Sequence, residues 1–531
     1  MKRFLFTVMV ACVCLSGCAA PEAANTFSPT ELETETPQPS WIHAFTLTQT
    51  TPKTPLPTST ATRTPTSTHT STPSPPVKLA YTISIVSPFK RTLHVHLEIT
   101  DLYDPILILT YWTYAGNWNA DWLNPLNSTT NIEATTSDGD PLAVSIVEDG
   151  IEWTGEGIQI NALGNNHIIL DYEVNVGIVD QNFSGDHPIL IAGYMNDWFT
   201  LVESEFLLLV PADVEDRAYQ MELRIDYPEN QLSIAPWEEI GTHFYQINAQ
   251  NMEFSYGVIA FGQIMTREQE IGDTVVRTGA YGFSRSGFDL VADSTFRIFR
   301  YFEEEFGSSR TPFYTFFFVP DLIDYRYLMS FDVQQGGYFT QYMNRYRSFW
   351  SDNVANPIAH NWIGGGFHGE HWFQEGFSDY YGLKACEDIG FYSHAIVQEE
   401  LIARYSQYKT EIIGSVYDIP LGNAALLYSP DHEVQYNMLV KVKGSLFAYS
   451  LDLMISELTA GERSLDDLVA LLYSKYYNSP TYVDVGQILE AAEQATGLDL
   501  SDFFEEYVRK NTPLPLEIQQ GGLNLKEDYL P

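Results

Sequence analysis

The chain has 531 residues, of which 44% are hydrophobic and 14% aromatic, enough for more than one packed domain. Its 69 acidic residues far outnumber its 28 basic residues, which gives a formal net charge of −41 at pH 7. A surface this acidic repels phosphate backbones and anionic lipid headgroups, so the composition excludes nucleic acid as an expected partner.

The N-terminus resembles a bacterial lipoprotein signal. Lys2 and Arg3 precede an apolar run that is too short to span a membrane, and the sequence LSGC then ends at Cys18. We expect residues 1–17 to be removed as a signal peptide and Cys18 to become the lipidated first residue. The expected location is the bacterial cell envelope, outside the cytoplasm, with the lipid on Cys18 as the membrane anchor. An ordinary secretory signal with an incidental cysteine is the alternative.

Residues 18–76 are predicted to be a disordered stalk. Of the 31 residues from position 46 to position 76, 24 are Ser, Thr or Pro. Such a segment buries too little apolar area to offset its ordering entropy. Of the four cysteines, Cys12 and Cys14 leave with the signal and Cys18 is acylated. Cys386 therefore has no disulfide partner, and we expect it to be a small buried hydrophobic residue.

Residues 77–264 are predicted to form an N-terminal antiparallel β-sandwich. Leu93, Val95, Leu97 and Ile99 alternate with polar residues, and turn markers such as DGD and LGNN separate further short apolar runs. No cluster of catalytic residue types stands out in this region. It is therefore expected to be a scaffold or a binding face.

Residues 265–531 are predicted to form an α/β and α-helical domain. The stretch 294–307 has phenylalanines at helical spacing, and 311–320 has the continuous apolar character of a buried strand. Ser464 with Asp467 predicts a capping box, and Gly497 predicts a helix end. The remaining helices are expected at 394–408, 437–458, 464–477, 484–497 and 501–509.

Two neighbouring motifs point to a family. AHNWIG, which contains His360, and HWFQEGFSDYY, which contains Glu375, resemble the site of the gluzincin metallopeptidases, specifically the aminopeptidase N and glycyl aminopeptidase-like families. Further likeness covers most of residues 250–525. The resemblance implies a multidomain α+β fold, in which the sandwich precedes a thermolysin-like α/β plus α-helical peptidase-type domain. It also implies a zinc cofactor, with His360 as the second ligand and Glu375 as the third.

The motif departs from that family at each critical position. The first zinc ligand is replaced by Asn356 and the general base by Pro357, which can neither bind a metal nor move a proton. We expect Asn356 and Pro357 to be the N-cap and first residue of a helix that starts there. The spacing from His360 to Glu375 is four residues shorter than in the family. The strand GGYFTQYM lacks the carboxylate that binds a substrate amino terminus, and Lys441 replaces the tyrosine that steadies the oxyanion.

Two arrangements of the remaining residues are open. In a rebuilt site, His371 and Glu375 lie four apart on one helix and join His360 as metal ligands, with Glu370 as general base. In a vestigial site, His360 is a hydrogen-bonded core histidine and His371 a helix-start residue. Glu375 is then a partly buried carboxylate that needs a new partner, for which His360 is a candidate.

The sequence favours a surface-tethered, catalytically inactive lipoprotein that binds peptides or glycans, or another surface protein, with zinc absent or weakly bound. Loss of the base or the metal alone would reduce hydrolysis by orders of magnitude. The alternative is an active zinc-dependent aminopeptidase that uses the rearranged metal site. A purely structural envelope protein is a third possibility.

Overall fold

The computed structural model describes residues 76–111, 125–147, 156–176, 179–180, 189–190, 193–212, 219–247, 257–319, 331–333, 336–339, 347, 350–364, 367–427, 438–477, 479–519 and 521–526. The predicted signal, Cys18 and nearly all of the predicted stalk lie outside these residues. Within the described residues, no helix is both long enough and apolar enough to cross a membrane.

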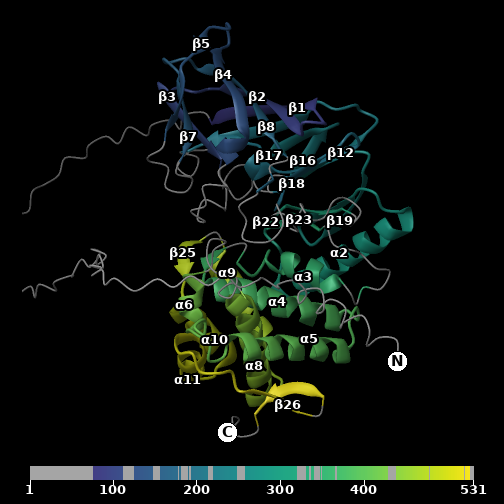
Figure 1. Ribbon diagram of the computed structural model, residues 1–531, viewed down its shortest axis with the longest axis vertical. Coiled ribbons are helices and arrows are strands. Elements are labelled where there is room, and N and C mark those ends of the chain that lie inside the picture. Colours follow the sequence, from purple (N-terminus) through teal and green to yellow (C-terminus); the bar gives the residue numbers. More distant parts are fainter. Residues whose placement is uncertain are drawn as a thin grey trace, which may run out of the picture. The chain divides into compact units, whose positions relative to one another are not determined.

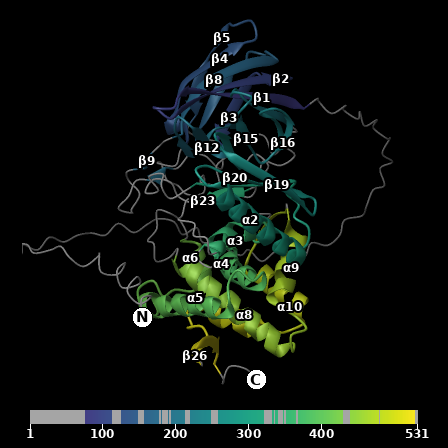
Figure 2. The same ribbon diagram turned by 90° about the vertical axis from the view of Figure 1, so that its right-hand side faces the viewer.

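The N-terminal part of the body is built on an eight-stranded sheet (Figures 1 and 2). Its strands lie in the spatial order β16 (Glu238–Gly241), β17 (Phe244–Ile247), β14 (Tyr219–Ile225), β1 (Val77–Ser87), β2 (Thr92–Thr100), β8 (His167–Asn175), β4 (Thr129–Thr136) and β5 (Pro141–Leu142). The predicted alternation in β2 is confirmed, because its apolar residues are buried and the residues between them are partly or fully exposed.

One pairing in this sheet differs from the prediction. β1 pairs antiparallel with β2 but parallel with β14, so that Leu79 lies opposite both Ile99 and Met221. The expectation of a wholly antiparallel arrangement is therefore wrong at β14. A parallel partner needs a long crossover, which here is the whole stretch between β1 and β14, and strand periodicity carries no information about such a distant partner.

Smaller sheets complete this part of the chain. One contains β13 (Leu209–Pro211), β3 (Ile106–Tyr111), β7 (Gly157–Asn161) and β6 (Val144–Val147), and another contains β11 (Gly193–Met195), β12 (Phe199–Glu203), β18 (Val258–Gly262) and β15 (Leu232–Ile234). A two-stranded sheet pairs β9 (Val179–Asp180) with β10 (Ile189–Leu190), and 3₁₀ turns occupy Pro125–Ser128 and Ser204–Phe206.

Two buried tyrosines of the eight-stranded sheet donate hydrogen bonds toward the β13 sheet. Tyr81 Oη donates to Leu209 O at 2.7 Å, and Tyr172 Oη donates to Leu207 O at 2.9 Å. Both sheets also contribute side chains to one hydrophobic core. The phenol groups therefore satisfy main-chain carbonyls that the core would otherwise leave without a partner.

A five-stranded mixed sheet follows. Its spatial order is β19 (Met265–Ile271), β20 (Thr274–Ala280), β21 (Phe313–Phe318), β23 (Gly336–Phe339) and β22 (Phe331–Val333). Helix α2 (Arg285–Phe306) connects the parallel strands β20 and β21. The predicted helix and buried strand are confirmed, but α2 begins nine residues earlier than expected. Its N-cap is Ser284, whose hydroxyl accepts from Gly287 N at 3.2 Å.

The remainder is largely helical. The α-helices are α3 (Ser351–Ala359), α4 (His371–Asp388), α5 (His394–Gln407), α6 (Leu421–Ala425), α8 (Gly444–Leu458), α9 (Leu465–Tyr476), α10 (Val485–Thr496) and α11 (Ser501–Phe504), and π-helical turns occupy Tyr408–Ile412, Leu439–Lys443 and Glu505–Arg509. The strand pairs are β24 (Phe367–Gly369) with β25 (Ser479–Val483), and β26 (Leu516–Gln519) with β27 (Gly522–Leu525). The predicted capping box at Ser464 and the left-handed helix end at Gly497, with φ 74°, are confirmed.

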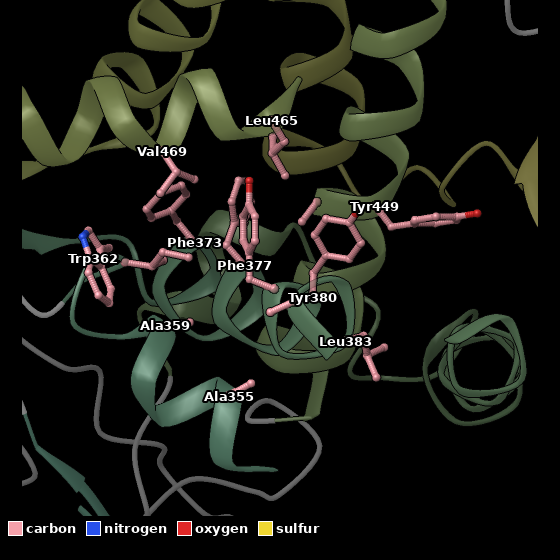
Figure 3. Close-up of a cluster of buried hydrophobic side chains, with 14 of the residues drawn as sticks. Ala355, Ala359, Trp362, Phe373, Phe377, Tyr380, Leu383, Tyr449, Leu465 and Val469 are labelled. Atoms are coloured by element: carbon pink, nitrogen blue, oxygen red, sulfur yellow. The ribbon is translucent and has the colours of Figure 1, made fainter. Parts of the chain in front are cut away.

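Helix α4 lies at the centre of the helical core. Its buried side chains, among them Phe373, Phe377 and Leu383, belong to one core with buried side chains of α3, α8 and α9 (Figure 3). Cys386 is buried and unpaired, as predicted. The helix has buried residues on most of its circumference, which is typical of a helix enclosed by others.

Two glycines bring α4 and α8 into backbone contact. A Cβ placed on Gly376 would lie 2.5 Å from the Cα and carbonyl carbon of Gly444. A Cβ on Gly444 would in turn lie 2.7 Å from Trp372 O. Because these contacts are with main-chain atoms, no side-chain rearrangement relieves them. The crossing therefore requires glycine on both helices.

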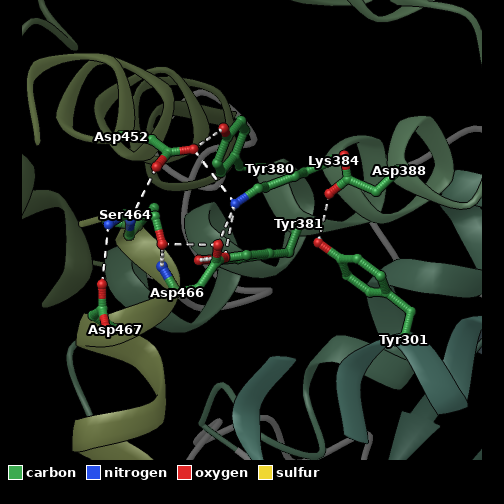
Figure 4. Close-up of polar contacts among 10 residues, drawn as sticks. Tyr301, Tyr380, Tyr381, Lys384, Asp388, Asp452, Ser464, Asp466 and Asp467 are labelled. Atoms are coloured by element: carbon green, nitrogen blue, oxygen red, sulfur yellow. Dashed lines mark hydrogen bonds and ion pairs between the residues drawn. The ribbon is translucent and has the colours of Figure 1, made fainter. Parts of the chain in front are cut away.

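A buried charge cluster joins α4 to α8 and α9 (Figure 4). Lys384 Nζ donates to both carboxylate oxygens of Asp466 at 2.7 Å and lies 3.7 Å from Asp452 Oδ2. Tyr381 donates to Asp466 and Tyr380 to Asp452, at 2.8 Å and 2.6 Å. The Lys384 and Asp466 side chains are each 18% exposed. One ammonium thus balances two carboxylates in a largely water-excluded position.

Replacement of Lys384 by Met is expected to lower the free energy of unfolding by about 3–5 kcal/mol, because two partly buried carboxylates lose their counter-charge. Denaturant unfolding followed by circular dichroism measures the change. Lys475→Met is the matched control, since its ion pair with Glu490 is longer, at 3.7 Å, and exposed. An equal loss in both variants would contradict the structural role given to the cluster.

Gly376→Ala is expected to destabilise the protein by more than about 2 kcal/mol, or to prevent folding, since the added methyl group meets main-chain atoms. Gly422→Ala is the control, because its added Cβ has its nearest neighbours at 3.8–3.9 Å and alanine favours a helix. Thermal unfolding compares the two variants. A Gly376 variant as stable as the control would show that the helices can move apart freely.

Candidate functional site

Helix α3 carries the residues at the positions of the missing first ligand and base. It begins at Ser351 after Trp350, and Pro357 lies inside it rather than at its start. The prediction that Asn356 and Pro357 begin a helix is therefore wrong. The proline ring removes the main-chain hydrogen bond to the residue four positions earlier, and α3 ends two residues later. The preference of proline for a first helical turn misled the prediction, because five preceding residues, 351–355, already form the helix.

Packing against α4 holds this strained end of α3. Gly382 of α4 lies so close to α3 that an added Cβ would be 3.0 Å from Asp352 O and 3.4 Å from Asn356 N. Ala355 and Ala359 of α3, on either side of Pro357 in the sequence, are buried in the same core (Figure 3). Tertiary contact therefore compensates for the local disadvantage of Pro357.

His360 is held in one tautomer by two neighbours. Its Nδ1 lies 3.2 Å from Ile363 O and 3.3 Å from Ser378 Oγ. The Ser378 hydroxyl donates its own proton to Gln374 O at 2.6 Å, so Ser378 can accept from the ring. Both neighbours of Nδ1 are acceptors, and we assign the ring proton to Nδ1 on this basis. His360 is thus a partly buried, hydrogen-bonded histidine.

Glu375 forms an ion pair with Lys441. Their Oε2 and Nζ atoms are 3.0 Å apart, with the glutamate side chain 19% exposed and the lysine 51% exposed. Burial alone would raise the pKa of Glu375, but the nearby ammonium of Lys441, with a smaller electrostatic effect from His360, outweighs burial and lowers the pKa to about 2. The expected new partner of this carboxylate is therefore identified as Lys441, and His360 acts on it electrostatically.

The other two residues of the rebuilt site lie at the start of α4. His371 is the first residue of α4. Burial lowers the pKa of His371 and so favours a neutral ring, while the Glu375 carboxylate acts in the opposite direction. Glu370 precedes His371 as the N-cap. Burial raises the pKa of Glu370, and the nearby Asp484 carboxylate adds to the rise. Glu370 thus lies near Asp484 and Val485 at the start of α10, and its main-chain N donates to Val483 O of β25 at 3.2 Å.

The described residues do not fit a zinc ion. Among them, no group of three or more His, Cys, Asp and Glu side chains is arranged to hold a metal. His360 and His371 both lower the pKa of Glu375 electrostatically. The group that forms an ion pair with its carboxylate, however, is the ammonium of Lys441. A zinc ion bound to this carboxylate would have to approach a positive charge already 3.0 Å away. We therefore derive no chemical step through zinc.

A second carboxylate of the same motif is also paired. Asp379 accepts from Arg404 of α5 through both oxygens, at 2.8 Å and 3.1 Å. No local pattern predicts this pair, because Asp379 and Arg404 lie on different helices. For Lys441 a signal existed, since the family resemblance places it, by its spacing from Gly444, at the position of the family's tyrosine. Its contact with Glu375 could be recognised only once the crossing of α4 and α8 was known.

No protein-family model and no curated protein sequence matches the chain. Solved structures do. An aminopeptidase N family protein from Idiomarina loihiensis superposes with a TM-score of 0.65 at 15% identity, over 82% of this chain and 76% of that one. An M1 zinc metallopeptidase from Deinococcus radiodurans superposes with a TM-score of 0.52 at 14% identity, over 83% of this chain and 95% of that one.

Identities this low establish a shared fold without establishing a shared activity. Both solved relatives belong to the gluzincin type of peptidase that the motifs around His360 and Glu375 resemble. The chain therefore has the mixed α+β fold of the M1 aminopeptidases.

Proposed function

We propose that this protein is a non-catalytic, lipid-tethered member of the aminopeptidase-type fold that binds peptides or glycans, or another surface protein, through the region of the former active site. One observation carries the proposal: the ammonium of Lys441 lies 3.0 Å from the Glu375 carboxylate, which the family resemblance assigns to the metal. The positive charge at this carboxylate is thus supplied by the chain itself.

The chemistry of peptide hydrolysis supports the same proposal. A metallopeptidase needs a Lewis acid to polarise the scissile carbonyl and a base to activate water. The position of the base holds Pro357, inside a helix, and the carboxylate of the third ligand is paired with Lys441. Glu370, the only replacement base that the sequence suggested, lies beside Asp484 and Val485.

A peptide is the ligand class that the fold itself suggests. A structure of the Deinococcus radiodurans metallopeptidase holds the peptide Tyr-Ser-Ala. We propose that binding of this kind can persist here without cleavage. The proposed anchor is the lipid on Cys18, which rests on the resemblance of residues 1–18 to a lipoprotein signal.

Purified full-length protein is expected to contain far less than one zinc ion per chain after dialysis, and to leave a mixed panel of aminoacyl and peptide substrates uncut when zinc is added. Elemental analysis and mass spectrometry of the peptides measure both. The physical reason is that Glu375 is already paired with Lys441 and that Pro357 occupies the position of the general base.

The competing function, an active zinc aminopeptidase, predicts the opposite. Stoichiometric zinc that disappears in both His360→Ala and His371→Ala, together with peptide cleavage that those variants abolish, would overturn the proposal. Cys386→Ala is a suitable control for contamination by other metals, because Cys386 carries the free thiol of the described residues.

Lys441→Met is expected to reduce the free energy of unfolding at pH 7 by about 1 kcal/mol, since Lys441 is half exposed and solvent screens its charge, with a smaller effect at low pH. The pKa of Glu375 is about 2 in the folded protein and 4.5 ordinarily. A lowered pKa stabilises the fold above pH 4.5, and this contribution is lost as the pH falls from 4.5 toward 2.

Denaturant unfolding of the wild type and the variant at pH 3 and pH 7 tests this expectation. Lys441→Arg is the matched control, because it keeps the positive charge and should retain most of the pH dependence. A Lys441→Met loss that is the same at both pH values would show that the lysine stem, rather than its charge, is what stabilises α4.

A further inference from the structure

A cavity of about 500 Å³ has neither Glu375 nor Lys441 among its lining residues. It is formed by the loop 307–312 between α2 and β21, the turn between β19 and β20, and the second half of α9. Its volume is in the range of small-molecule sites, which is about 300–1,000 Å³. All of its walls belong to the described residues.

The wall made by the loop is fixed by hydrogen bonds. Asn361 donates to Ser309 Oγ at 2.8 Å and accepts from Thr311 Oγ1 at 2.9 Å. The indole of Trp362 donates to Gly307 O at 2.9 Å. The two residues that follow His360 in the AHNWIG motif thus hold this loop in place. A wall with so many fixed contacts is pre-formed, so a ligand would lose little free energy in ordering it.

A positive charge stands on the loop. The guanidinium of Arg310 lies over the rings of Tyr473 and Tyr477, at 5.6 Å and 4.9 Å from their centroids. Its side chain is exposed, and none of the ion pairs found among the described residues includes it, although the chain has a large acidic surplus. The nearby Glu303 carboxylate accepts from Ser309 N at 2.7 Å instead. Arg310 is therefore oriented by aromatic faces while its donors remain available to an anion.

A negative charge stands on another wall. Asp273 lies in the turn between β19 and β20, is exposed, and makes no ion pair within the described part of the chain. Phe306, Pro312 and Tyr473 also line the cavity and supply its apolar surface. The cavity thus offers one cation, one anion and an apolar wall.

We propose that this cavity binds a zwitterionic amino acid or a short peptide. Its carboxylate would accept from the Arg310 guanidinium, which is suited to two parallel hydrogen bonds, and its ammonium would pair with Asp273. A simple anion would be repelled by Asp273, and a simple amine by Arg310. The proposal does not depend on the function proposed for the Glu375 region, because the two sites share no residue.

Isothermal titration of the full-length protein with L-phenylalanine, N-acetyl-L-phenylalanine and L-phenylalaninamide tests the proposal. L-Phenylalanine should bind saturably in the millimolar range. Each derivative, which lacks one charge, should bind about tenfold more weakly, as expected for loss of one charge-assisted hydrogen bond. Absence of saturable binding, or equal binding of all three, would overturn the proposal.

Two variants assign the charges. In Arg310→Gln, L-phenylalanine and its amide should bind equally weakly, while in Asp273→Asn the free and N-acetylated forms should become equal. Arg285→Gln is the matched control, since Arg285 is an exposed arginine paired with Asp289 at the start of α2, and should change nothing. Discrimination that survives in both variants would place the ligand elsewhere, and the zinc and cleavage assays above would be unaffected by that result.

Discussion

The contact between Gly376 and Gly444 is the constraint on which the rest of the helical region depends. Because neither residue has a side chain, the backbones of α4 and α8 touch, and the register of the two helices is fixed at this point. Glu375 precedes one glycine and Lys441 lies three residues before the other, so the same crossing places the carboxylate beside the ammonium. Bulkier residues would separate both the helices and the charges.

The polar residues of α4 are then satisfied one by one from neighbouring helices. Glu375 pairs with Lys441, Asp379 with Arg404 of α5, and Lys384 with Asp466 of α9. Ion pairs at buried positions add less stability than their number suggests, but breaking one is costly, so they fix which helix faces which. A helix that carries a metal ligand in the resembled family is here held by side-chain charges.

The sequence was sufficient for features that depend on local pattern. The alternation in β2, the phenylalanine stripe of α2, the capping box at Ser464 and the burial of Cys386 are each set within a few residues of chain. The family motif around His360 likewise indicated the fold that the solved structures support. Each of these features follows from residues close together in the sequence, so no contact with a distant segment is needed to predict it.

The failures share the opposite property. The parallel partner of β1, the position of Pro357 inside α3, and the contact of Lys441 with Glu375 all depend on segments far apart in the chain or on tertiary packing. Pro357 shows this most clearly, because its local preference favours a helix start and only the approach of Gly382 explains its position. Local reasoning identified which site residues had changed but not what replaced their interactions.

The ion pair at Glu375 also has a consequence for how the protein responds to its surroundings. A metal ion exchanges with its environment, so a chelator or a zinc-poor medium can empty a metalloprotein. The cation at Glu375 is covalently part of the chain and is present once in every molecule from synthesis onward. The charge balance at Glu375 is therefore provided by the chain itself and does not depend on metal supply.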